Sequence, residues 1–489
     1  MPKSGAEPVQ DPVLAREVLA AAQGASPLLC AIAYRAVEAR FGWRGRGFAS
    51  EPASGTAVRW ALAERPAESA VPVLLEALEV TDTCVRGIAA RLVAHARTQS
   101  ATPGLLRVLG SARPEARSAA ALALGLSGAD EAVDRLIERL GDESAEVRGT
   151  AAWALGAIDQ ERAAAPLRPV LRDPVADVRA SAAQALGQLQ DRTAVDALSQ
   201  VLRSDQEERV RQAAAEALGH IGVKEGVAAL TAGLGDASAR VRRTAAWALG
   251  QIKDRSAAQG LARALTDQDG EVREMGTWAL GELEDRTAVP LLAIRLTSDD
   301  RPEVRRQAAW AMGQIEDRGA VEPLGTALRS DRDTDVRRMA AWALGQIEDA
   351  EAVTPLSAAL GDGDARVRDR AAWALGQIEP DRAPDALLRA ARDSSAVVRE
   401  RVLWALGQIG DDAAVPVLRQ ALGDGNARVR RAALWALGQI QSDAARDAIS
   451  DALKDDNAEV RAAAARALGG HNINPWPMPM PMPMPRPYP

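Results

Sequence analysis

Apolar and polar residues along positions 300–331 follow the period of two consecutive amphipathic helices. The first apolar stripe has the spacing of one face of an α-helix with 3.6 residues per turn, and consists of Val304, Ala308, Ala311, Met312 and Ile315. A polar Glu-Asp-Arg turn at 316–318 interrupts the stripe. The second stripe consists of Val321, Leu324 and Leu328. The pattern predicts a helix, a tight turn and a second helix.

The predicted helix starts carry residues that favour them. Asp300 is followed by Pro302, and an aspartate before an early proline is typical of a helix N-terminus. Asp317 stands directly before the second helix, where its carboxylate is placed to accept hydrogen bonds from unpaired backbone N–H groups. We therefore expect caps at Asp300 and Asp317.

The whole helix pair recurs along the chain. An Ala-Leu-Gly sequence or a close variant returns twelve times at a spacing of 31 or 32 residues, with its glycine at Gly125, Gly156, Gly187, Gly219, Gly250, Gly281, Gly313, Gly345, Gly376, Gly407, Gly438 and Gly469. A repeat of this length is the mark of an array in which each unit packs on its neighbours. The fold class is therefore predicted as all-α, an α-solenoid of stacked helix pairs, and the small residues beside the glycines are expected to set the stacking distance.

The regularity of the repeat divides the chain into four segments. Residues 1–50 are expected to form an N-terminal tail and helical cap, with helices at 14–22 and 28–39. Residues 51–110 are expected to hold degenerate repeats, residues 111–470 the regular array, and residues 471–489 a Pro/Met-rich tail. An irregular first unit is expected because the end of a solenoid needs an atypical unit to cover its apolar face.

Two recurring phrases link this chain to a known family. They are Asp-Pro/Ala-Glu-Val-Arg at the helix start and Ala-Ala-Trp-Ala-Leu-Gly-Gln-Ile-Glu-Asp-Arg at its end. Because of these two phrases, residues from about 80 to 470 resemble HEAT-like repeats of the short, 31-residue type found in phycobilisome-lyase-like proteins and bacterial scaffolds. The resemblance implies a superhelical array in which the second helix of each pair lines the concave surface. For function it says little.

Tryptophans recur at one position of the repeat. Nine of the eleven stand three residues before the glycine position: Trp60, Trp153, Trp247, Trp278, Trp310, Trp342, Trp373, Trp404 and Trp435. On a helical wheel Trp310 points well over 90° away from the centre of its apolar stripe. We therefore expect the indoles on the outer side of the helix that, by the resemblance, lines a groove. An alternative left open is that each indole packs across the neighbouring repeat.

Glutamine recurs four residues after the tryptophan, on the same helix face. These positions are Gln188, Gln251, Gln314, Gln346, Gln377, Gln408 and Gln439. Indoles beside amide groups would form a surface that binds extended peptide, with aromatic contacts and backbone hydrogen bonds.

An arginine eight residues before the glycine is more regular still. The series is Arg117, Arg148, Arg179, Arg211, Arg242, Arg273, Arg305, Arg337, Arg368, Arg399, Arg430 and Arg461. A row of arginines can bind phosphates or acidic peptides, but the turns are equally rich in aspartate. We expect a structural network of Arg–Asp pairs between repeats.

The C-terminal segment has proline at every second position and therefore cannot form a helix or a sheet. As polyproline II its fifteen residues would extend about 46 Å, at about 3.1 Å per residue. We expect this tail to be a ligand of the groove, in the same or a neighbouring molecule, through Trp476, Met478, Met480, Met482, Met484, Arg486 and Tyr488. The alternative is a disordered tail that only happens to be apolar.

Composition narrows the function classes. A net charge of −7 gives the chain no overall basic character, so nucleic-acid binding is not expected. Four arginines do stand near the helix that lines the groove: Arg243, Arg306, Arg338 and Arg431. They are interleaved with the acidic residues Glu274, Asp369 and Glu400. Cys30 and Cys84 are too few for a disulfide framework or a thiolate metal site. We found no signal peptide and no apolar run of membrane-spanning length, and we expect a cytoplasmic protein.

No catalytic motif is present. His95, His220 and His471 are far apart and none is followed by glutamate, and no HExxH, P-loop or GxSxG sequence occurs. We therefore expect no catalytic residue, no metal and no cofactor. The sequence favours a non-catalytic scaffold that binds protein or extended peptide, including itself as a homo-oligomer or filament. A bilin-lyase-like, chromophore-handling protein and a nucleic-acid-binding HEAT-like protein are the alternatives.

Overall fold

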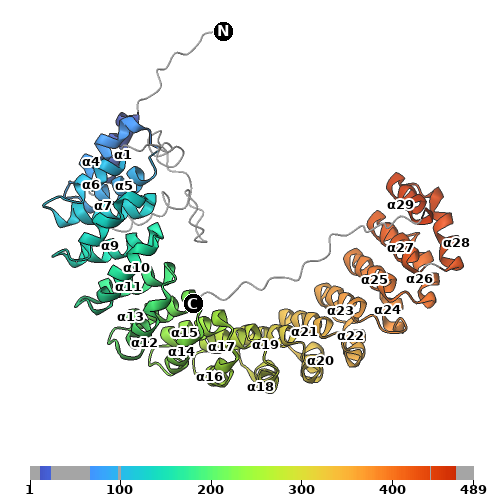
Figure 1. Ribbon diagram of the computed structural model, residues 1–489. Helices are drawn as coiled ribbons and strands as arrows, with labels where there is room; N and C mark the ends of the chain where they lie inside the picture. Colours follow the sequence, from blue (N-terminus) through green and yellow to red (C-terminus); the bar gives the residue numbers. More distant parts are fainter. Residues whose placement is uncertain (1–10, 24–65, 97–100, 441, 470–489) are drawn as a thin grey trace, which may run out of the picture. The chain divides into compact units, whose positions relative to one another are not determined.

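The regular part of the chain consists of a long helix and a shorter helix in each repeat. The structure, a computed structural model, describes residues 11–23, 66–96, 101–440 and 442–469 (Figure 1). The predicted helix at 28–39, Trp60 and the predicted tail ligands Trp476 to Tyr488 lie outside these residues. Throughout the described ranges every regular element is helical, which confirms the predicted all-α solenoid.

The long helices carry the Arg, Trp and Gly positions of the repeat. They are α5 (Thr83–Ala94), α7 (Pro114–Ser127), α9 (Ala145–Ile158), α11 (Ala176–Gln188), α13 (Glu208–Ile221), α15 (Ala239–Ile252), α17 (Gly270–Glu282), α19 (Pro302–Ile315), α21 (Thr334–Ile347), α23 (Ala365–Ile378), α25 (Ala396–Ile409), α27 (Ala427–Ile440) and α29 (Ala458–Leu468).

The short helices precede them. They are α4 (Val71–Ala77), α6 (Ala101–Val108), α8 (Val133–Arg139), α10 (Ala164–Leu167), α12 (Val195–Ser204), α14 (Val227–Gly233), α16 (Ala258–Ala264), α18 (Val289–Ser298), α20 (Val321–Ser330), α22 (Val353–Ala359), α24 (Asp385–Ala390), α26 (Val415–Ala421) and α28 (Asp443–Asp451). Helix α1 (Asp11–Ala22) stands before the repeats and packs on α4 and α5.

One-turn 3₁₀ segments connect many of these helices. They are η1 (Glu68–Ala70), η2 (Asp130–Ala132), η3 (Glu161–Ala163), η4 (Arg168–Arg172), η5 (Arg192–Ala194), η6 (Lys224–Gly226), η7 (Arg255–Ala257), η8 (Arg286–Ala288), η9 (Arg318–Ala320), η10 (Ala350–Ala352), η11 (Asp412–Ala414) and η12 (Ala452–Lys454).

The helix starts of the central repeat agree with one of the two predicted caps. Asp317 caps η9, because its carboxylate accepts a hydrogen bond from Gly319 N at 2.8 Å. The expected cap at Asp300 is wrong: α19 begins at Pro302 with Arg301 as its N-cap, and the carboxylate of Asp299 accepts from Arg301 N at 3.1 Å. Asp300 instead pairs with Arg273 of the preceding repeat.

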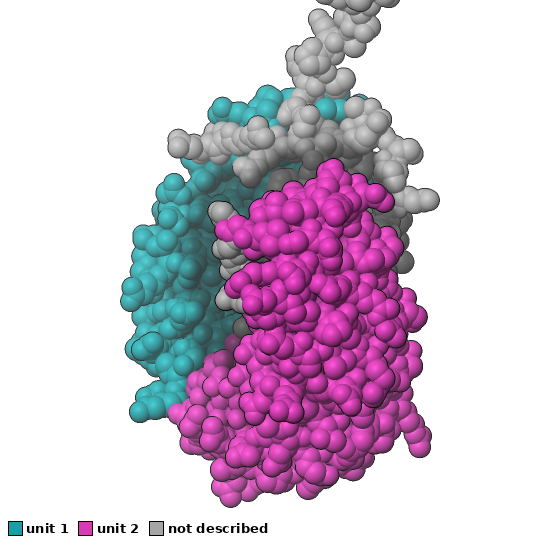
Figure 2. Space-filling view, turned by 90° about the vertical axis from the view of Figure 1, so that its right-hand side faces the viewer, with its two compact units in different colours: residues 1–233 teal, residues 234–489 magenta. Residues whose placement is uncertain are grey.

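The chain divides into two compact units, residues 1–233 and residues 234–489, which are coloured separately in Figure 2. In the second unit the long helices form one row and the short helices a second row beside it (Figure 1). From α17 to α27, each long helix packs on the long helices before and after it. The boundaries predicted at 50, 110 and 470 stay predictions. None of the helices in the described ranges combines the length and apolar character of a membrane span.

Many long helices end in a residue with left-handed backbone. This residue is glycine in three repeats, Gly128, Gly222 and Gly410, but glutamate in others, and Glu316 has a φ of 51°. A side chain in this region costs about 1 kcal/mol relative to glycine.

We therefore expect Glu316→Gly to raise the free energy of unfolding by about 0.5–1 kcal/mol and Gly410→Ala to lower it by a similar amount. Urea unfolding followed by circular dichroism measures both changes. Equal effects of the same sign would contradict this explanation.

Candidate functional site

Three rows of side chains run along the long helices of the second unit. We call this surface the long-helix face and define it by α15, α17, α19, α21, α23, α25 and α27. In α21 the rows contain Arg338, Trp342 and Gln346, which are four residues apart and so lie on one side of the helix. The equivalent residues in the other repeats form a charged row, a tryptophan row and a glutamine row.

The tryptophan row is buried. Trp278, Trp310, Trp342, Trp373, Trp404 and Trp435 have exposed fractions between 2% and 9%, whereas Trp153 and Trp247 are half-buried. The expectation that these indoles form an exposed aromatic surface is therefore wrong for the six buried rings. Their direct contact with a peptide stays a prediction.

The indoles pack against the glycine of the preceding repeat. A Cβ added to Gly313 would lie 2.7 Å from Cζ3 of Trp342 and 3.0 Å from Cα of Ala343. Six other glycines meet a tryptophan Cζ3 in the same way: Gly125, Gly250, Gly281, Gly345, Gly376 and Gly407. The repeated glycine therefore leaves room for the indole and for close approach of two long helices, which is the alternative that the sequence left open.

The helical wheel failed at this point for a geometric reason. It assumes that a helix has one buried side, but a long helix in this array is covered by a short helix and by long helices on both flanks. In α19 the stripe from Val304 to Ile315 is buried as predicted, and so are Gln307, Ala309 and Trp310. A direction more than 90° from the stripe thus leads to the neighbouring repeat rather than to solvent.

The glutamine row remains accessible. Gln251, Gln314, Gln346, Gln377 and Gln408 are half-buried, and Gln439 is exposed. Within the described part of the chain no hydrogen bond involves the side-chain amides of these six residues. In α17 the equivalent residue is Glu282, whose carboxylate pairs with Lys253 at 2.7 Å. From α19 to α27 the row therefore offers five consecutive amides with unused donors and acceptors.

The charged row is half-buried and contains both signs. Its members are Arg243, Glu274, Arg306, Arg338, Asp369, Glu400 and Arg431. Burial raises the pKa of the carboxyl groups of Glu274 and Glu400 above their ordinary values. One member, Asp369, pairs with Arg401, which lies next to Glu400 and outside the row, at 3.2 Å. The mixture of signs agrees with the expectation that this face is not a uniformly basic nucleic-acid surface.

A small pocket interrupts the face between α21 and α23. Arg338, Met339, Trp342 and Arg370 line it. Arg338 and Trp342 are among the residues expected at this face from the sequence, whereas Met339 and Arg370 are not. The sequence signal that could have identified Arg370 is its position three residues before Trp373, which places both on the same helix face. In the structure the guanidinium carbon of Arg370 lies 5.2 Å from the ring centroid of Trp373.

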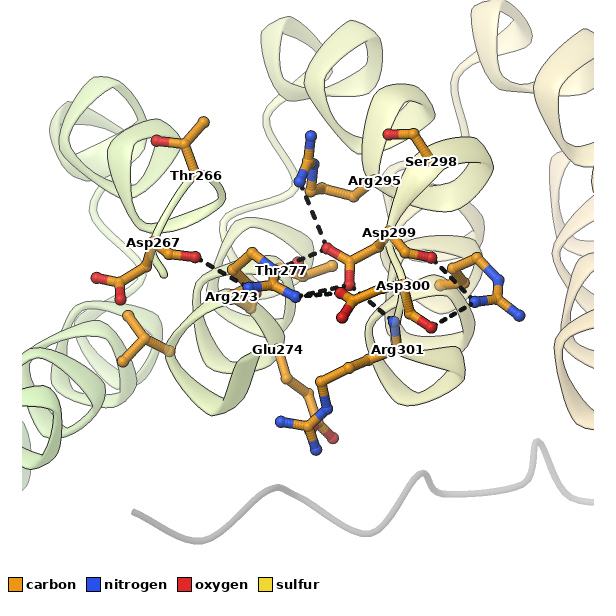
Figure 3. Close-up of polar contacts among 12 residues, drawn as sticks. Thr266, Asp267, Arg273, Glu274, Thr277, Arg295, Ser298, Asp299, Asp300 and Arg301 are labelled. Atoms are coloured by element: carbon orange, nitrogen blue, oxygen red, sulfur yellow. Dashed lines mark hydrogen bonds and ion pairs between the residues drawn. The ribbon is translucent and has the colours of Figure 1, made fainter. Parts of the chain in front are cut away.

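The arginine series forms the predicted network between repeats. Arg273 donates to both carboxylate oxygens of Asp299 in the next repeat, at 2.8 and 3.0 Å, and to the backbone oxygen of Asp267 at 3.0 Å (Figure 3). The other pairs of this kind are Arg117–Asp142, Arg148–Asp173, Arg179–Asp205, Arg242–Asp267, Arg305–Asp331, Arg337–Asp362, Arg368–Asp393, Arg399–Asp424 and Arg430–Asp455. These arginines join successive repeats, and their side chains are already engaged.

The family assignment follows from the match between this repeat and a known pattern. Overlapping stretches of the chain match the pattern of HEAT repeats, at residues 102–187, 164–246, 195–281, 227–313, 260–333, 321–404 and 385–469. The chain belongs to the HEAT-repeat family. Curated proteins gave no match. In the described residues no three His, Cys, Asp or Glu side chains are grouped so as to hold a metal ion.

Several solved structures are similar to this HEAT protein. Kap121p is 14% identical with a TM-score of 0.48, over 88% of this chain and 53% of that protein. Kap95p, in a complex with RanGDP, is 14% identical with a TM-score of 0.44, over 94% and 67%. The complex of CpcE and CpcF of phycocyanin lyase from Nostoc is 25% identical with a TM-score of 0.32, over 46% and 93%. This HEAT chain spans about half the length of Kap121p.

The Arg–Asp pairs make the folding stability of the HEAT array depend on pH. Burial alone would raise the pKa of Asp142, but hydrogen bonds from Arg117 and Ser144 N outweigh it and hold the pKa below its ordinary value. The same direction holds for Asp173, Asp205, Asp267, Asp299, Asp362, Asp393 and Asp424. A lowered pKa in the folded state contributes stability above the unfolded value of about 3.9 and loses it as the pH falls toward the folded value.

We therefore expect these pairs to leave the free energy of unfolding nearly constant between about pH 5 and 7 and to lower it steeply below about pH 4. Glu274 and Glu400, with raised pKa values, act in the opposite sense, because the stability linked to their protonated forms is lost as the pH rises through those values. Urea unfolding at a series of pH values measures the balance. A free energy that rises steadily from pH 5 to pH 3 would contradict the dominance of the pairs.

Proposed function

We propose that this HEAT-repeat protein is a non-catalytic scaffold whose long-helix face binds an extended, proline-rich peptide. The observation that carries the proposal is the glutamine row, five consecutive half-buried or exposed amides without hydrogen bonds inside the described chain. A half-buried amide that makes no internal hydrogen bond loses free energy unless water or a ligand pairs with it. The buried indoles would then form the rigid floor beneath the peptide rather than stack on it.

The spacing of the row supports an extended ligand. Packed helices are roughly 8–10 Å apart, and three residues of polyproline II extend about 9 Å. One glutamine therefore stands opposite every third peptide residue. Each amide could then pair with a backbone carbonyl, which proline retains.

The chain itself contains a sequence of this kind. Residues 475–489 have proline at every second position. We propose this tail as the first occupant to test, within one molecule or between two. If it binds between molecules, the contact is head-to-tail, which gives either closed rings or open filaments.

The experiment compares the full chain with a chain ending at Gly470 by sedimentation velocity and tryptophan fluorescence. We expect removal of the tail to change the assembly state or to shift the emission of the remaining tryptophans. A synthetic peptide of residues 471–489 added to the shortened chain should reverse the change. No change in either signal, and no binding of the peptide, would exclude the tail as the occupant.

A further inference from the structure

One residue that lines the pocket between α21 and α23, Trp342, has an unpaired polar atom. Trp342 is only 5% exposed, and its indole Nε1 is buried without a hydrogen-bond partner. Its Cζ3 atom faces Gly313 of the preceding repeat, and Cζ3 and Nε1 are on opposite edges of an indole ring. The N–H therefore points away from Gly313. A buried donor left without an acceptor is costly, so an acceptor supplied by a ligand would be favourable.

The same pocket contains a cation without a paired carboxylate. Arg370 is half-buried, and among the described residues no carboxylate lies within ion-pair distance of its guanidinium. The adjacent Asp369 is held by Arg401, at 3.2 Å. Burial lowers the pKa of Arg370. The charge of Asp369 acts against this shift, and the charges of Arg401 and Arg338 act with it. By contrast, the ten arginines that join successive repeats are each paired with an aspartate, and we call these ten pairs the Arg–Asp ladder.

We propose that this pocket binds the carboxylate of a glutamate or aspartate side chain in an extended peptide lying along the long-helix face. Arg370 would supply the charge-assisted hydrogen bonds, Trp342 Nε1 a further donor, and Met339 an apolar wall. This inference rests on the proposed function and adds to it the chemistry of one ligand residue. The proposed ligand differs from the chain's own tail, because residues 471–489 contain no acidic residue.

Two observations favour a single carboxylate over a nucleic-acid phosphate backbone. Asp369 and Glu400 belong to the charged row beside the pocket, and the whole chain has a net charge of −7. A polyanion along the face would meet these carboxylates, whereas one acidic side chain among neutral residues would meet only the pocket.

The test uses the full chain and two capped hexapeptides labelled with fluorescein. One alternates proline and glutamate, and the other has glutamine in place of glutamate. We expect fluorescence anisotropy to give about tenfold tighter binding of the glutamate peptide at low salt, as expected for charge-assisted hydrogen bonds. Arg370→Met should remove this preference and leave the glutamine peptide unchanged. Arg389→Met, at an exposed position on α24, makes the same change in net charge and should keep the preference.

The outcomes separate the two proposals. If the glutamine peptide binds but the glutamate peptide binds no more tightly, the pocket proposal fails and the proposed function stands. A preference that survives Arg370→Met would assign it to the overall charge and overturn the pocket. Displacement of the glutamate peptide by an equal concentration of a DNA oligonucleotide would assign the pocket to phosphate and also overturn it. If neither peptide binds, both proposals fail.

Discussion

Replacement of Trp310 by alanine is expected to lower the free energy of unfolding by about 3–5 kcal/mol, the range for removal of a large buried aromatic side chain. Trp310 is 8% exposed, and its Cζ3 atom would lie 2.7 Å from a Cβ at Gly281. The loss therefore combines lost burial with a cavity between α17 and α19. Because a repeat contacts mainly its neighbours, amide hydrogen exchange should increase first in these two helices.

Trp153 provides a comparison at the same repeat position. It also meets a glycine, Gly125, but its side chain is half-buried, so Trp153→Ala should cost only about 1–3 kcal/mol. Urea unfolding measures both variants. A loss below about 1 kcal/mol for Trp310→Ala would mean that the indole contributes little to packing, as in the exposed surface that the helical wheel predicted.

Removal of one carboxylate from the ladder should be the second large effect. The side chains of Arg117 and Asp142 are 7% and 3% exposed, and Arg117 donates to both carboxylate oxygens, at 2.8 and 2.7 Å. Asp142→Asn removes the buried carboxylate and leaves Arg117 only the longer, exposed contact with Glu143, at 3.5 Å. We expect the free energy of unfolding to fall by about 2–4 kcal/mol, somewhat below the range for a fully buried pair, since Arg117 still donates to two backbone oxygens.

The same repeat contains a control pair on its surface. Arg135 and Glu138 lie 3.0 Å apart with side chains 65% and 49% exposed, so Glu138→Gln should change stability by less than about 0.5 kcal/mol. Thermal unfolding together with hydrogen exchange of α8 and α9 distinguishes the two positions. Equal losses for Asp142→Asn and Glu138→Gln would show that burial of the ladder adds nothing to its strength.

The sequence predicted those features that depend on local pattern and repeat spacing. The helix at 302–315 follows from apolar positions within one turn of each other, and Asp317 caps its turn because capping needs only adjacent residues. The Arg–Asp ladder was predictable because both partners recur with the repeat, so an arginine of one unit meets an aspartate of the next.

The remaining features depend on packing between repeats, which one helix does not encode. The burial of Trp310 follows from the glycine of a different helix, Gly281, 29 residues earlier in the chain. The pocket depends on Arg370 and Trp342, which come from neighbouring repeats and occupy different positions within them. The sequence pattern of one repeat therefore does not predict that Arg370 and Trp342 line the same pocket.

The most direct measurement of the central claim is the affinity of labelled peptide 471–489 for the chain ending at Gly470. In one variant Gln346, Gln377 and Gln408 are changed to alanine; the control variant changes Gln259 and Gln420, which are exposed on the short helices α16 and α26. If the glutamine row holds the peptide backbone, losing three neutral hydrogen bonds should raise Kd at least about tenfold, while the control stays unchanged. Equal affinities of both variants, or no binding at all, would contradict the account.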